Sequence, residues 1–452
     1  MNMNPLSVDA LVVGGGIGGL QTAVDLADQG FTVALVEKEP SIGGKMISLS
    51  KVFPTLDCSS CITTPKMAAA AHHPNVALLT YAELKSIEGE PGRYLARVEK
   101  KPRYVDEDLC IGCRQCEYGC PVTVPHAFEG GLGARRAAYV PFTNAIPQVA
   151  LLDMESCVLC GKCEKVCPAG AVDFSQKPEE VAVEAKTVIL ATGFELTPPT
   201  AKPQYGYDRI PNVLTALQME RLLAPHGPYG RMLRPSDGKV PESIAYVQCA
   251  GSRDQSLGVP YCSRVCCMYA IKQAMLLSGA LPLADITIYY MDIRAFGKGY
   301  EQFYQNAQAM GIEFVKGKVA RIRGGEDGSP VVRVEMVEED GVARERAHDL
   351  VVLSTGMLPG WRPDGVSPVS SSADGFIHLP QSKLRPTLTE SDGIFVAGTA
   401  AGPKDIVDSI LEGGSAAMEA SIFLRSLRSE AERDAPVERA TELATTGERS
   451  HE

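Results

Sequence analysis

The chain has 452 residues, enough for two or three domains, and 45% of them are hydrophobic, as in an ordinary globular protein. Its net charge of −11 argues against nucleic acid as a partner, because binding to phosphates needs a basic face. No apolar stretch approaches the roughly 20 residues that cross a bilayer, and the apolar run near the N-terminus stops at glycines, unlike a signal peptide. We therefore expect a cytoplasmic protein, peripheral to a membrane at most, and then through partners.

The 14 cysteines fall in tight clusters instead of being spread along the chain. A secreted disulfide framework distributes its cysteines through a short chain. Clustering in a long chain indicates metal or redox chemistry in a reducing compartment. The clusters lie at residues 58–61, 110–120, 157–167 and 249–267.

The first elements in chain order form a strand–turn–helix–strand unit that ends in an acidic residue. We expect a strand at 9–13, a helix at 20–29 and a second strand at 32–36. The turn has the G-x-G-x-x-G pattern, which permits a tight turn, close approach of a pyrophosphate and close packing of helix on strand. The unit predicts a dinucleotide site in which the pyrophosphate lies at the helix N-terminus, on Gly14, Gly16 and Gly19, with a ribose hydroxyl on Glu37.

Three further motifs resemble those of flavoproteins that bind two dinucleotides, and they favour FAD over NAD. Gly43-Gly44-Lys45 follows the acidic strand end, and the strand at 188–193 ends in Ala-Thr-Gly. The late motif at 393–398 usually ends in Gly-Asp but here continues to Thr399, so Lys404 and Asp405 are candidates to replace the missing carboxylate. The residues predicted to bind FAD are Gly14, Gly16, Gly19, Glu37, Lys38, Gly43, Gly44, Lys45, Ala191, Thr192, Gly193, Gly398, Lys404, Asp405 and Ile406.

Cys58 and Cys61 form a C-x2-C pair between the second glycine motif and the next strand. The spacing is typical of a redox dithiol beside a flavin, and we take the pair as the candidate catalytic residues. The same two cysteines could instead contribute to a metal cluster or simply pack. Lys66 is a candidate partner of the flavin, although a solvated lysine is the simpler interpretation.

The most specific pattern in the chain is C-x2-C-x2-C-x3-C-P, which occurs twice. The spacing places three thiolates around a [4Fe–4S] cubane, and in two-cluster ferredoxins the fourth cysteine ligates the other cluster. A zinc site instead prefers two separated C-x2-C pairs and four cysteines in all. We expect one cluster on Cys110, Cys113, Cys116 and Cys167, and a second on Cys157, Cys160, Cys163 and Cys120.

The ferredoxin pattern interrupts the FAD-binding domain. Strands are expected before it at 76–81 and 94–98, and after it at 182–185 and 188–191, so the insert divides a β-meander. The segment 121–156, with its glycines at 130–133, is expected to form a surface loop. Attachment at both ends predicts a fixed distance between flavin and clusters.

A second dinucleotide fold is expected from residue 243, with a strand at 244–248, a helix at 265–277 and a strand at 286–291. Its first turn has four cysteines where a phosphate-binding turn would be rich in glycine. A turn and a helix N-terminus favour thiolates, so a third cluster is predicted, with buried structural cysteines as the alternative. Because Cys266 and Cys267 are adjacent, one of them could be a packing residue. The candidate ligands are Cys249, Cys262, Cys266 and Cys267.

Two segments, 248–270 and 56–67, resemble those of the heterodisulfide reductase A subunits and their bacterial relatives, and the likeness extends over residues 8–425. The resemblance implies a thioredoxin-reductase-like fold with FAD, an inserted ferredoxin and an unusual cluster on the late cysteines. Methanogen members carry an extra N-terminal domain and a C-terminal ferredoxin. The chain therefore looks more like the A subunits of quinone-interacting and sulfur-oxidising bacterial complexes.

The resemblance also implies a function. We expect an oxidoreductase component that relays, or bifurcates, electrons between FAD, [4Fe–4S] clusters and partner subunits. The implied partners are B- and C-type subunits and an electron-donor protein, in a hetero-oligomer. The alternatives are a stand-alone NAD(P)H-dependent disulfide or ferredoxin oxidoreductase, which the missing glycine turn disfavours, and an inert scaffold that binds zinc.

The predicted architecture is an α/β, two-dinucleotide-binding Rossmann flavoprotein with an inserted 2[4Fe–4S] ferredoxin. The FAD-binding domain is expected in three parts, divided by the ferredoxin and by the second dinucleotide module, and a charged tail follows. The expected bounds are 1–100, 176–240 and 356–425 for the FAD-binding domain, 101–175 for the ferredoxin, 241–355 for the module with the late cysteines, and 426–452 for the tail.

Overall fold

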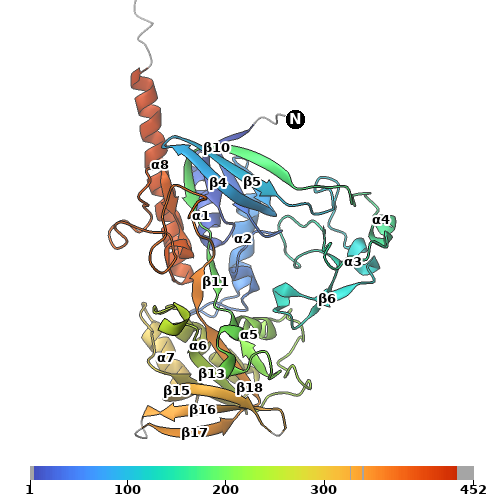
Figure 1. The fold of residues 1–452 in the computed structure, drawn as a ribbon, viewed down its shortest axis with the longest axis vertical. Helices are drawn as coiled ribbons and strands as arrows, with labels where there is room; N and C mark the ends of the chain where they lie inside the picture. Colours follow the sequence, from blue (N-terminus) through green and yellow to red (C-terminus); the bar gives the residue numbers. More distant parts are fainter. Residues whose placement is uncertain (1–4, 326, 338–340, 435–452) are drawn as a thin grey trace, which may run out of the picture.

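The computed structural model describes residues 5–325, 327–337 and 341–434. Two α/β domains lie one above the other, and the segment with the ferredoxin pattern projects from their side (Figure 1). Among the described residues, no helix is both long and apolar enough to span a bilayer. The two large sheets, each with helices packed on it, agree with the predicted α/β class.

The first domain is built on a seven-stranded sheet in the order β3-β2-β1-β10-β5-β4, with β20 also paired to β10. The long strand β10 pairs with β1 along one edge, while β5 and β20 share its other edge. The parallel strands are β1 (Leu6–Val13), β2 (Val33–Glu37), β3 (Val76–Thr80), β10 (Glu179–Leu190) and β20 (Ile394–Val396). The antiparallel strands are β4 (Ala82–Glu90) and β5 (Arg93–Lys100).

Three helices complete this domain: α1 (Ile17–Asp28), α2 (Ser59–His72) and α8 (Ile406–Asp434). Leu20, Met67 and Leu424, one from each helix, belong to the same hydrophobic core as strand residues Val12 and Leu35. Helices α1 and α8 lie near opposite ends of the sequence. Burial of their apolar side chains in one core therefore holds these distant segments together. Residues 426–434 of the predicted tail continue α8, and the rest of that tail lies outside the described residues.

The insert leaves the sheet after β5 and returns at β10, and these two strands pair antiparallel. The predicted meander is confirmed in part, since the insert divides an antiparallel run of β4, β5 and β10. The strands expected at 182–185 and 188–191 are one continuous strand, β10, and β3 pairs parallel with β2 instead of joining the run. Strand β4 was not predicted from the sequence. The insert itself contains short elements: α3 (Gln115–Gly119), β6 (Thr123–Pro125), β7 (Ala134–Arg136), β8 (Ala138–Tyr139), β9 (Leu151–Leu152) and α4 (Lys162–Val166).

The prediction that 121–156 is a surface loop is wrong. This segment forms two small antiparallel sheets, and its residues Ala138, Val140 and Leu152 join the core of the insert. Buried apolar side chains of this kind cannot stay on a solvated loop without exposing their surface to water.

The second domain has a seven-stranded sheet in the order β12-β18-β13-β14-β15-β16-β17. The strands are β12 (Val213–Thr215), β13 (Ser243–Ala250), β14 (Asp285–Tyr290), β15 (Glu313–Gly324), β16 (Pro330–Met336), β17 (Val342–Ala347) and β18 (Leu350–Thr355). The helices are α5 (Ala216–Leu223), α6 (Cys266–Ala280) and α7 (Tyr300–Ala309). A small sheet of β11 (Phe194–Leu196) and β19 (Met357–Pro359) connects this domain to the first.

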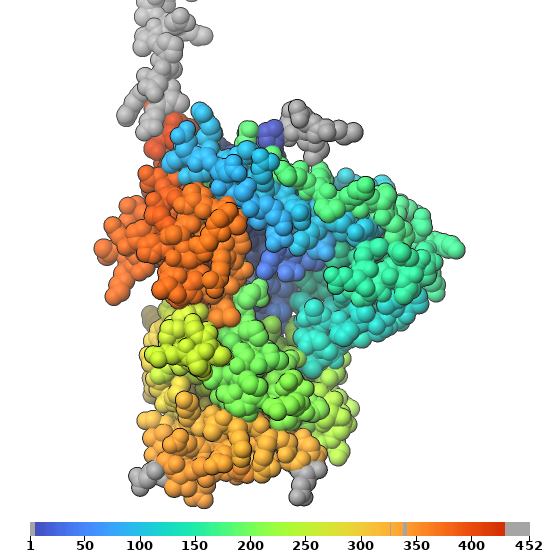
Figure 2. Space-filling view, viewed as in Figure 1, coloured from blue at the N-terminus to red at the C-terminus, as the bar shows by residue number. Residues whose placement is uncertain are grey.

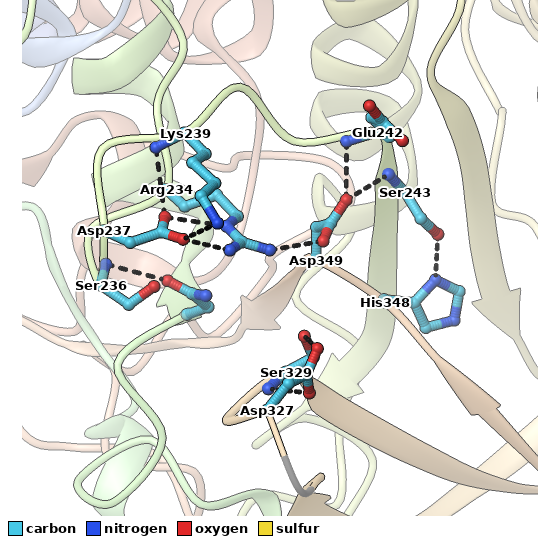
Figure 3. Close-up of polar contacts among 11 residues, drawn as sticks. Arg234, Ser236, Asp237, Lys239, Glu242, Ser243, Asp327, Ser329, His348 and Asp349 are labelled. Carbon is cyan, nitrogen blue, oxygen red and sulfur yellow. Dashed lines mark hydrogen bonds and ion pairs between the residues drawn. The ribbon is translucent and has the colours of Figure 1, made fainter.

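A polar cluster fixes the start of β13 against the neighbouring strands (Figure 3). The carboxylate of Asp349 accepts from the backbone N–H groups of Glu242 and Ser243, and it pairs with Arg234. The buried ring of His348 contacts Ser243 Oγ and Tyr289 Oη, each at 2.9 Å. These contacts join β13, β14 and β18 at one end of the sheet, away from the cavity described next.

Candidate functional site

A cavity of about 890 Å³ lies where the two domains and the insert meet. The surface is hollowed between these three parts in the space-filling view (Figure 2). The glycine turn after β1 and the start of α8 line one wall, and Val265, Tyr269 and Lys272 from the second domain line another. The insert contributes His126, Ala127, Phe128, Arg135, Tyr139, Pro141, Phe142 and Leu151.

The glycine turn has the geometry expected of a pyrophosphate cradle. Gly14 has φ +111°, and a side chain there would meet the backbone oxygen of Ala191 at 2.2 Å. A Cβ on Gly19 would lie 1.9 Å from Gly14 O, so helix and strand need both glycines to approach. A Cβ on Gly16 would meet only Gly44 Cα, at 4.0 Å. The space over Gly16, at the N-terminus of α1, therefore suits a phosphate.

Charged side chains surround this turn. The buried carboxylate of Glu37 accepts from Gly15 N at 2.6 Å and from Glu39 N at 2.8 Å. Burial raises the pKa of Glu37, and these hydrogen bonds counteract part of that rise. Lys38 and Lys45 both pair with Glu195 of β11, at 3.1 and 3.0 Å. Because Glu37 also lines the cavity, it is placed to accept from a ribose.

The remaining residues predicted to bind FAD also line the cavity, except Gly19 and Gly43, whose backbones pack behind the turn. Ala191, Thr192 and Gly193 follow β10, and Gly398 follows β20. At the start of α8, Lys404 pairs with Glu412, and Asp405 accepts from Tyr300 Oη at 2.7 Å. Both candidates for the missing carboxylate role therefore already have partners in the protein.

FAD fits this cavity. A dinucleotide with a flat ring system needs room for its pyrophosphate, an acceptor for its ribose and apolar walls for its rings. The cavity has the open space over Gly16, the carboxylate of Glu37 at the end of β2, and apolar side chains from the insert. The chain is thus a flavoprotein, and its cavity faces both the insert and helix α6.

The insert brings seven of its eight cysteines, all except Cys160, into two groups. Burial, together with the nearby thiols of Cys110, Cys113 and Cys167, raises the pKa of Cys116 to about 12. Burial likewise raises the pKa of Cys163, and Cys157 and Cys120 add to that rise. Each group therefore combines a run with the fourth cysteine of the other run. This is the interleaved pattern of two-cluster ferredoxins, and the individual ligands stay predictions.

The four late cysteines gather at the turn after β13 and the first turn of α6. Cys249 has φ +57°, a left-handed conformation that is uncommon for a cysteine. Cys266 Sγ contacts Thr355 O at 3.7 Å and Cys267 Sγ contacts Asp292 O at 3.8 Å, so the adjacent side chains diverge. Burial raises the pKa of Cys266, and the other three thiols raise it further. All four thus lie within electrostatic reach of one another.

Among the described residues, no group of three or more His, Cys, Asp or Glu side chains is arranged as a site for a metal ion. The ligand sets named here therefore rest on sequence spacing and on the electrostatic grouping of the thiols. None of the 14 cysteines forms a disulfide bond.

Cys58 and Cys61 lie outside the cavity, at the N-terminus of α2. Cys58 Sγ accepts from Cys61 N at 3.3 Å. The thiol of Cys61 lowers the pKa of Cys58 by hydrogen bonding, and the same interaction raises the pKa of Cys61. Cys61 is exposed and Lys66 donates to Gln21 at 2.5 Å. The pair is thus a dithiol at the surface, and Lys66 has a partner other than a flavin.

Sequence reasoning missed one polar group in the cavity wall. Glu220 of α5 pairs with Lys272 of α6 and accepts from Gln273 and from Ser50 Oγ, the last at 2.7 Å. Burial would raise the pKa of Glu220, but Lys272 and these hydrogen bonds hold that pKa below its usual range. The sequence did contain a signal for this cluster, a lysine within the mostly apolar helix 266–280. Because an unpaired lysine is seldom buried, a buried carboxylate partner could have been expected.

Comparisons with known proteins agree with this arrangement and confirm the predicted fold class. A family model described as an NAD(P)-binding Rossmann-like domain matches residues 12–62, and one described as a 4Fe-4S dicluster domain matches residues 109–172. Thioredoxin reductases from T. acidophilum and Lactococcus lactis share the fold, with TM-scores of 0.53 and 0.52 and 15% and 14% identity. Each comparison covers 93% of this chain and 99% of the solved one.

Curated relatives are much more similar in sequence. The A subunit of the H(2):CoB-CoM heterodisulfide,ferredoxin reductase of Methanothermobacter thermautotrophicus is 46% identical over 93% of this chain and 65% of its own length. The second iron-sulfur A subunit of the CoB--CoM heterodisulfide reductase of Methanopyrus kandleri is 50% identical over 92% of this chain and 64% of its own length. The chain thus spans slightly less than two thirds of the length of these relatives.

Proposed function

Because the chain belongs to the family of heterodisulfide reductase A subunits, we propose that it is the electron-transfer component of a heterodisulfide-reductase-like complex. Its activity is that of an oxidoreductase that works together with B- and C-type subunits and an electron-donor protein. A cytoplasmic location suits cysteines that form no disulfide bond, because disulfides are rare in a reducing compartment.

One observation carries this proposal. A single cavity is lined by the first domain with its glycine turn, by the insert with its eight cysteines, and by the second domain with the late cysteines. The glycine turn supplies the dinucleotide cradle, Phe128 and Phe142 come from the insert, and Val265 directly precedes Cys266. Electron transfer between centres requires that they be close and held rigidly. A flavin in this cavity would lie between the insert clusters and the late cysteine cluster.

FAD supplies a centre that exchanges electrons in pairs or singly, which couples two-electron chemistry to one-electron clusters. The residues of the chain bind and shield it. The turn at 14–19 holds the pyrophosphate, and Glu37 holds a ribose. The rings of Phe128 and Phe142 stack with their centroids 4.8 Å apart and form an apolar part of the cavity wall. The buried pair of Lys272 and Glu220 places fixed charges on the opposite wall.

The proposal is tested by photoreducing the flavin of the cofactor-loaded chain and counting the electrons that reach the clusters by electron paramagnetic resonance. We expect electrons on the insert clusters of the natural chain and fewer in Cys163→Ala. Val158→Ala, an exposed neighbour without a thiol, is the matched control and keeps the natural yield. Rapid bleaching of the flavin by NADH alone would instead establish the stand-alone reductase.

A further inference from the structure

The flavin cavity and the loop that carries the late cysteines share one stretch of backbone, residues 355–357 between β18 and β19. Thr355 and Met357 both line the cavity. The same stretch also contacts the loop, because the backbone N–H of Met357 donates to Ser263 Oγ at 2.8 Å. The late cysteines therefore lie next to the wall of the flavin cavity.

Gly356 makes this close contact possible. A Cβ on Gly356 would meet Ser252 Oγ at 2.1 Å and Ser263 Oγ at 2.9 Å, so the loop packs directly on the backbone of the wall. The two serines are buried, and their hydroxyl oxygens lie 2.6 Å apart. A side chain at position 356 would push the loop away from the wall.

Tyr269 of α6 connects the cavity to the late cysteines. It lines the cavity together with Val265, and its hydroxyl donates to the carbonyl oxygen of Thr355 at 3.0 Å. Cys266 Sγ contacts the same carbonyl oxygen at 3.7 Å. Because Tyr269 and Cys266 are three residues apart on α6, their side chains lie on one face of the helix.

A cluster bound at these cysteines needs a hydrogen-bond donor at this point. Cys266 donates to Thr355 O as a thiol, but a cysteine that binds a cluster is a thiolate and has no proton to donate. Burial raises the pKa of Cys266, and hydrogen bonding from the Tyr269 hydroxyl opposes that rise. The same hydroxyl can thus donate to the thiolate sulfur.

We propose that Tyr269 is a positioning residue of the late cysteine site, whose hydroxyl stabilises the reduced form of a cluster bound through Cys266. Reduction adds negative charge to the cluster and its sulfurs, and a hydrogen bond to a sulfur is stronger when that charge is present. This role rests on the proposed function, because it needs a cluster on the late cysteines. It adds a side chain that lines the flavin cavity and also sets the reduction potential of the neighbouring centre.

A redox titration of the full, cofactor-loaded chain, followed by electron paramagnetic resonance, tests this proposal. The signal that Cys262→Ala lacks is assigned to the late cluster. We expect Tyr269→Phe to lower the equilibrium constant for reduction of this cluster about tenfold, which lowers its reduction potential by about 59 mV. The potentials of the insert clusters, measured in the same sample, stay unchanged. Iron and flavin per chain show that the variant is loaded like the natural chain.

Tyr261→Phe is the matched control, because it removes another tyrosine hydroxyl from the same wall, where it donates to Met357 O at 3.1 Å. It should keep the natural potential. An unchanged late potential in Tyr269→Phe, an equal fall in Tyr261→Phe, or loss of the late cluster in Tyr269→Phe would each overturn the role of Tyr269. A natural chain with the same spectrum as Cys262→Ala would overturn the late cluster and this role together. Photoreduction of the insert clusters tests the proposed function separately.

Discussion

At the scale of single residues, Gly16 and Lys272 show how much of the cavity depends on one side chain. Gly16 leaves space where a ligand phosphate belongs, and Lys272 neutralises the buried carboxylate of Glu220 in the cavity wall beside α6. Gly16 matters for the volume that it leaves free and Lys272 for the charge that it carries. Substitution of Gly16 should therefore change flavin affinity, and substitution of Lys272 should change stability and its pH dependence.

Gly16→Val fills the space over the glycine turn with two methyl groups. We expect flavin affinity to fall at least about tenfold while the fold is kept, because the backbone of Gly16 needs no positive φ. Flavin per chain after gel filtration and the circular dichroism spectrum measure the two effects. Gly324→Ala, where a Cβ meets nothing within 4 Å, is the control, and equal flavin loss in both variants would contradict the role of Gly16.

Lys272→Met leaves the Glu220 carboxylate buried without its cation. We expect a loss of about 3–5 kcal/mol in the free energy of unfolding at pH 8, as for other broken buried pairs. In the natural chain the lowered pKa of Glu220 stabilises the fold above pH 4.5, and this stability is lost as the pH falls below that value.

In Lys272→Met, burial without the cation raises the pKa of Glu220, so stability falls as the pH rises above 4.5. Urea unfolding at about pH 5 and about pH 8 measures this change of sign. The double variant K272M/E220Q removes the buried charge and recovers most of the stability at the higher pH. A variant with the same pH slope as the natural chain would contradict the account.

At the scale of elements, His348 lies just before β18 and contacts Ser243 of β13 (Figure 3). Its ring also contacts Tyr289 of β14, so it connects three strands of the second domain. Burial, together with the nearby Arg346 guanidinium, lowers the pKa of His348 to about 4. The neutral ring therefore stabilises the fold above pH 6.5, and this contribution is lost as the pH falls from 6.5 towards 4.

His348→Gln should abolish that part of the acid sensitivity. We expect the natural chain to lose up to about 3 kcal/mol more than the variant between about pH 6.5 and about pH 4. Chemical unfolding at several pH values measures the difference between the two proteins. Parallel pH curves would show that His348 keeps its charge state throughout.

Sequence reasoning was most successful for elements whose residues follow a simple period. The strand–turn–helix–strand unit was expected from residue 9 and lies at 6–37, and the helix expected at 265–277 lies at 266–280. The insertion between neighbouring strands of one sheet was also predicted. Strand β4 was missed because a register shift between Leu84 and Ser86 breaks its alternation of apolar and polar residues. The segment 121–156 was wrongly predicted to be a loop because its strands are too short to show a period in the sequence. Their apolar side chains form a core only when the strands pack together.

The contacts between distant parts could not be predicted at all. The Glu220 cluster joins α5, α6 and the loop at Ser50, which no local pattern connects. The position of Cys58 and Cys61 on the surface likewise depends on how α2 packs, although their spacing was evident. The predicted ligand sets and domain bounds stay predictions.

At the scale of the whole molecule, the insert is held by the second domain as well as by its own two connections. Arg221 of α5 pairs with Glu129 through two contacts, at 2.9 and 3.1 Å, and its guanidinium lies over the Phe128 ring. Gln218 donates to Gly130 O at 2.8 Å. A third attachment of this kind fixes the orientation of the insert toward the cavity.

Arg221→Ala should release that attachment. We expect amide hydrogen exchange in residues 126–133 to rise at least about tenfold, because the loop loses a nearly buried ion pair and a ring contact. Arg136→Ala, which removes an exposed arginine contact of β7 from the same insert, is the control. Unchanged exchange in Arg221→Ala would mean that the two covalent connections alone hold the insert.

The position of β10 in the middle of the first sheet has a consequence for biosynthesis. A ribosome releases β1, β2 and the whole insert before it releases β10, the strand that completes the edge of β1. The segment after β20 and the start of α8, which line the flavin cavity, emerge later still. The eight cysteines of the insert are therefore synthesised before the C-terminal segments that line the nucleotide pocket.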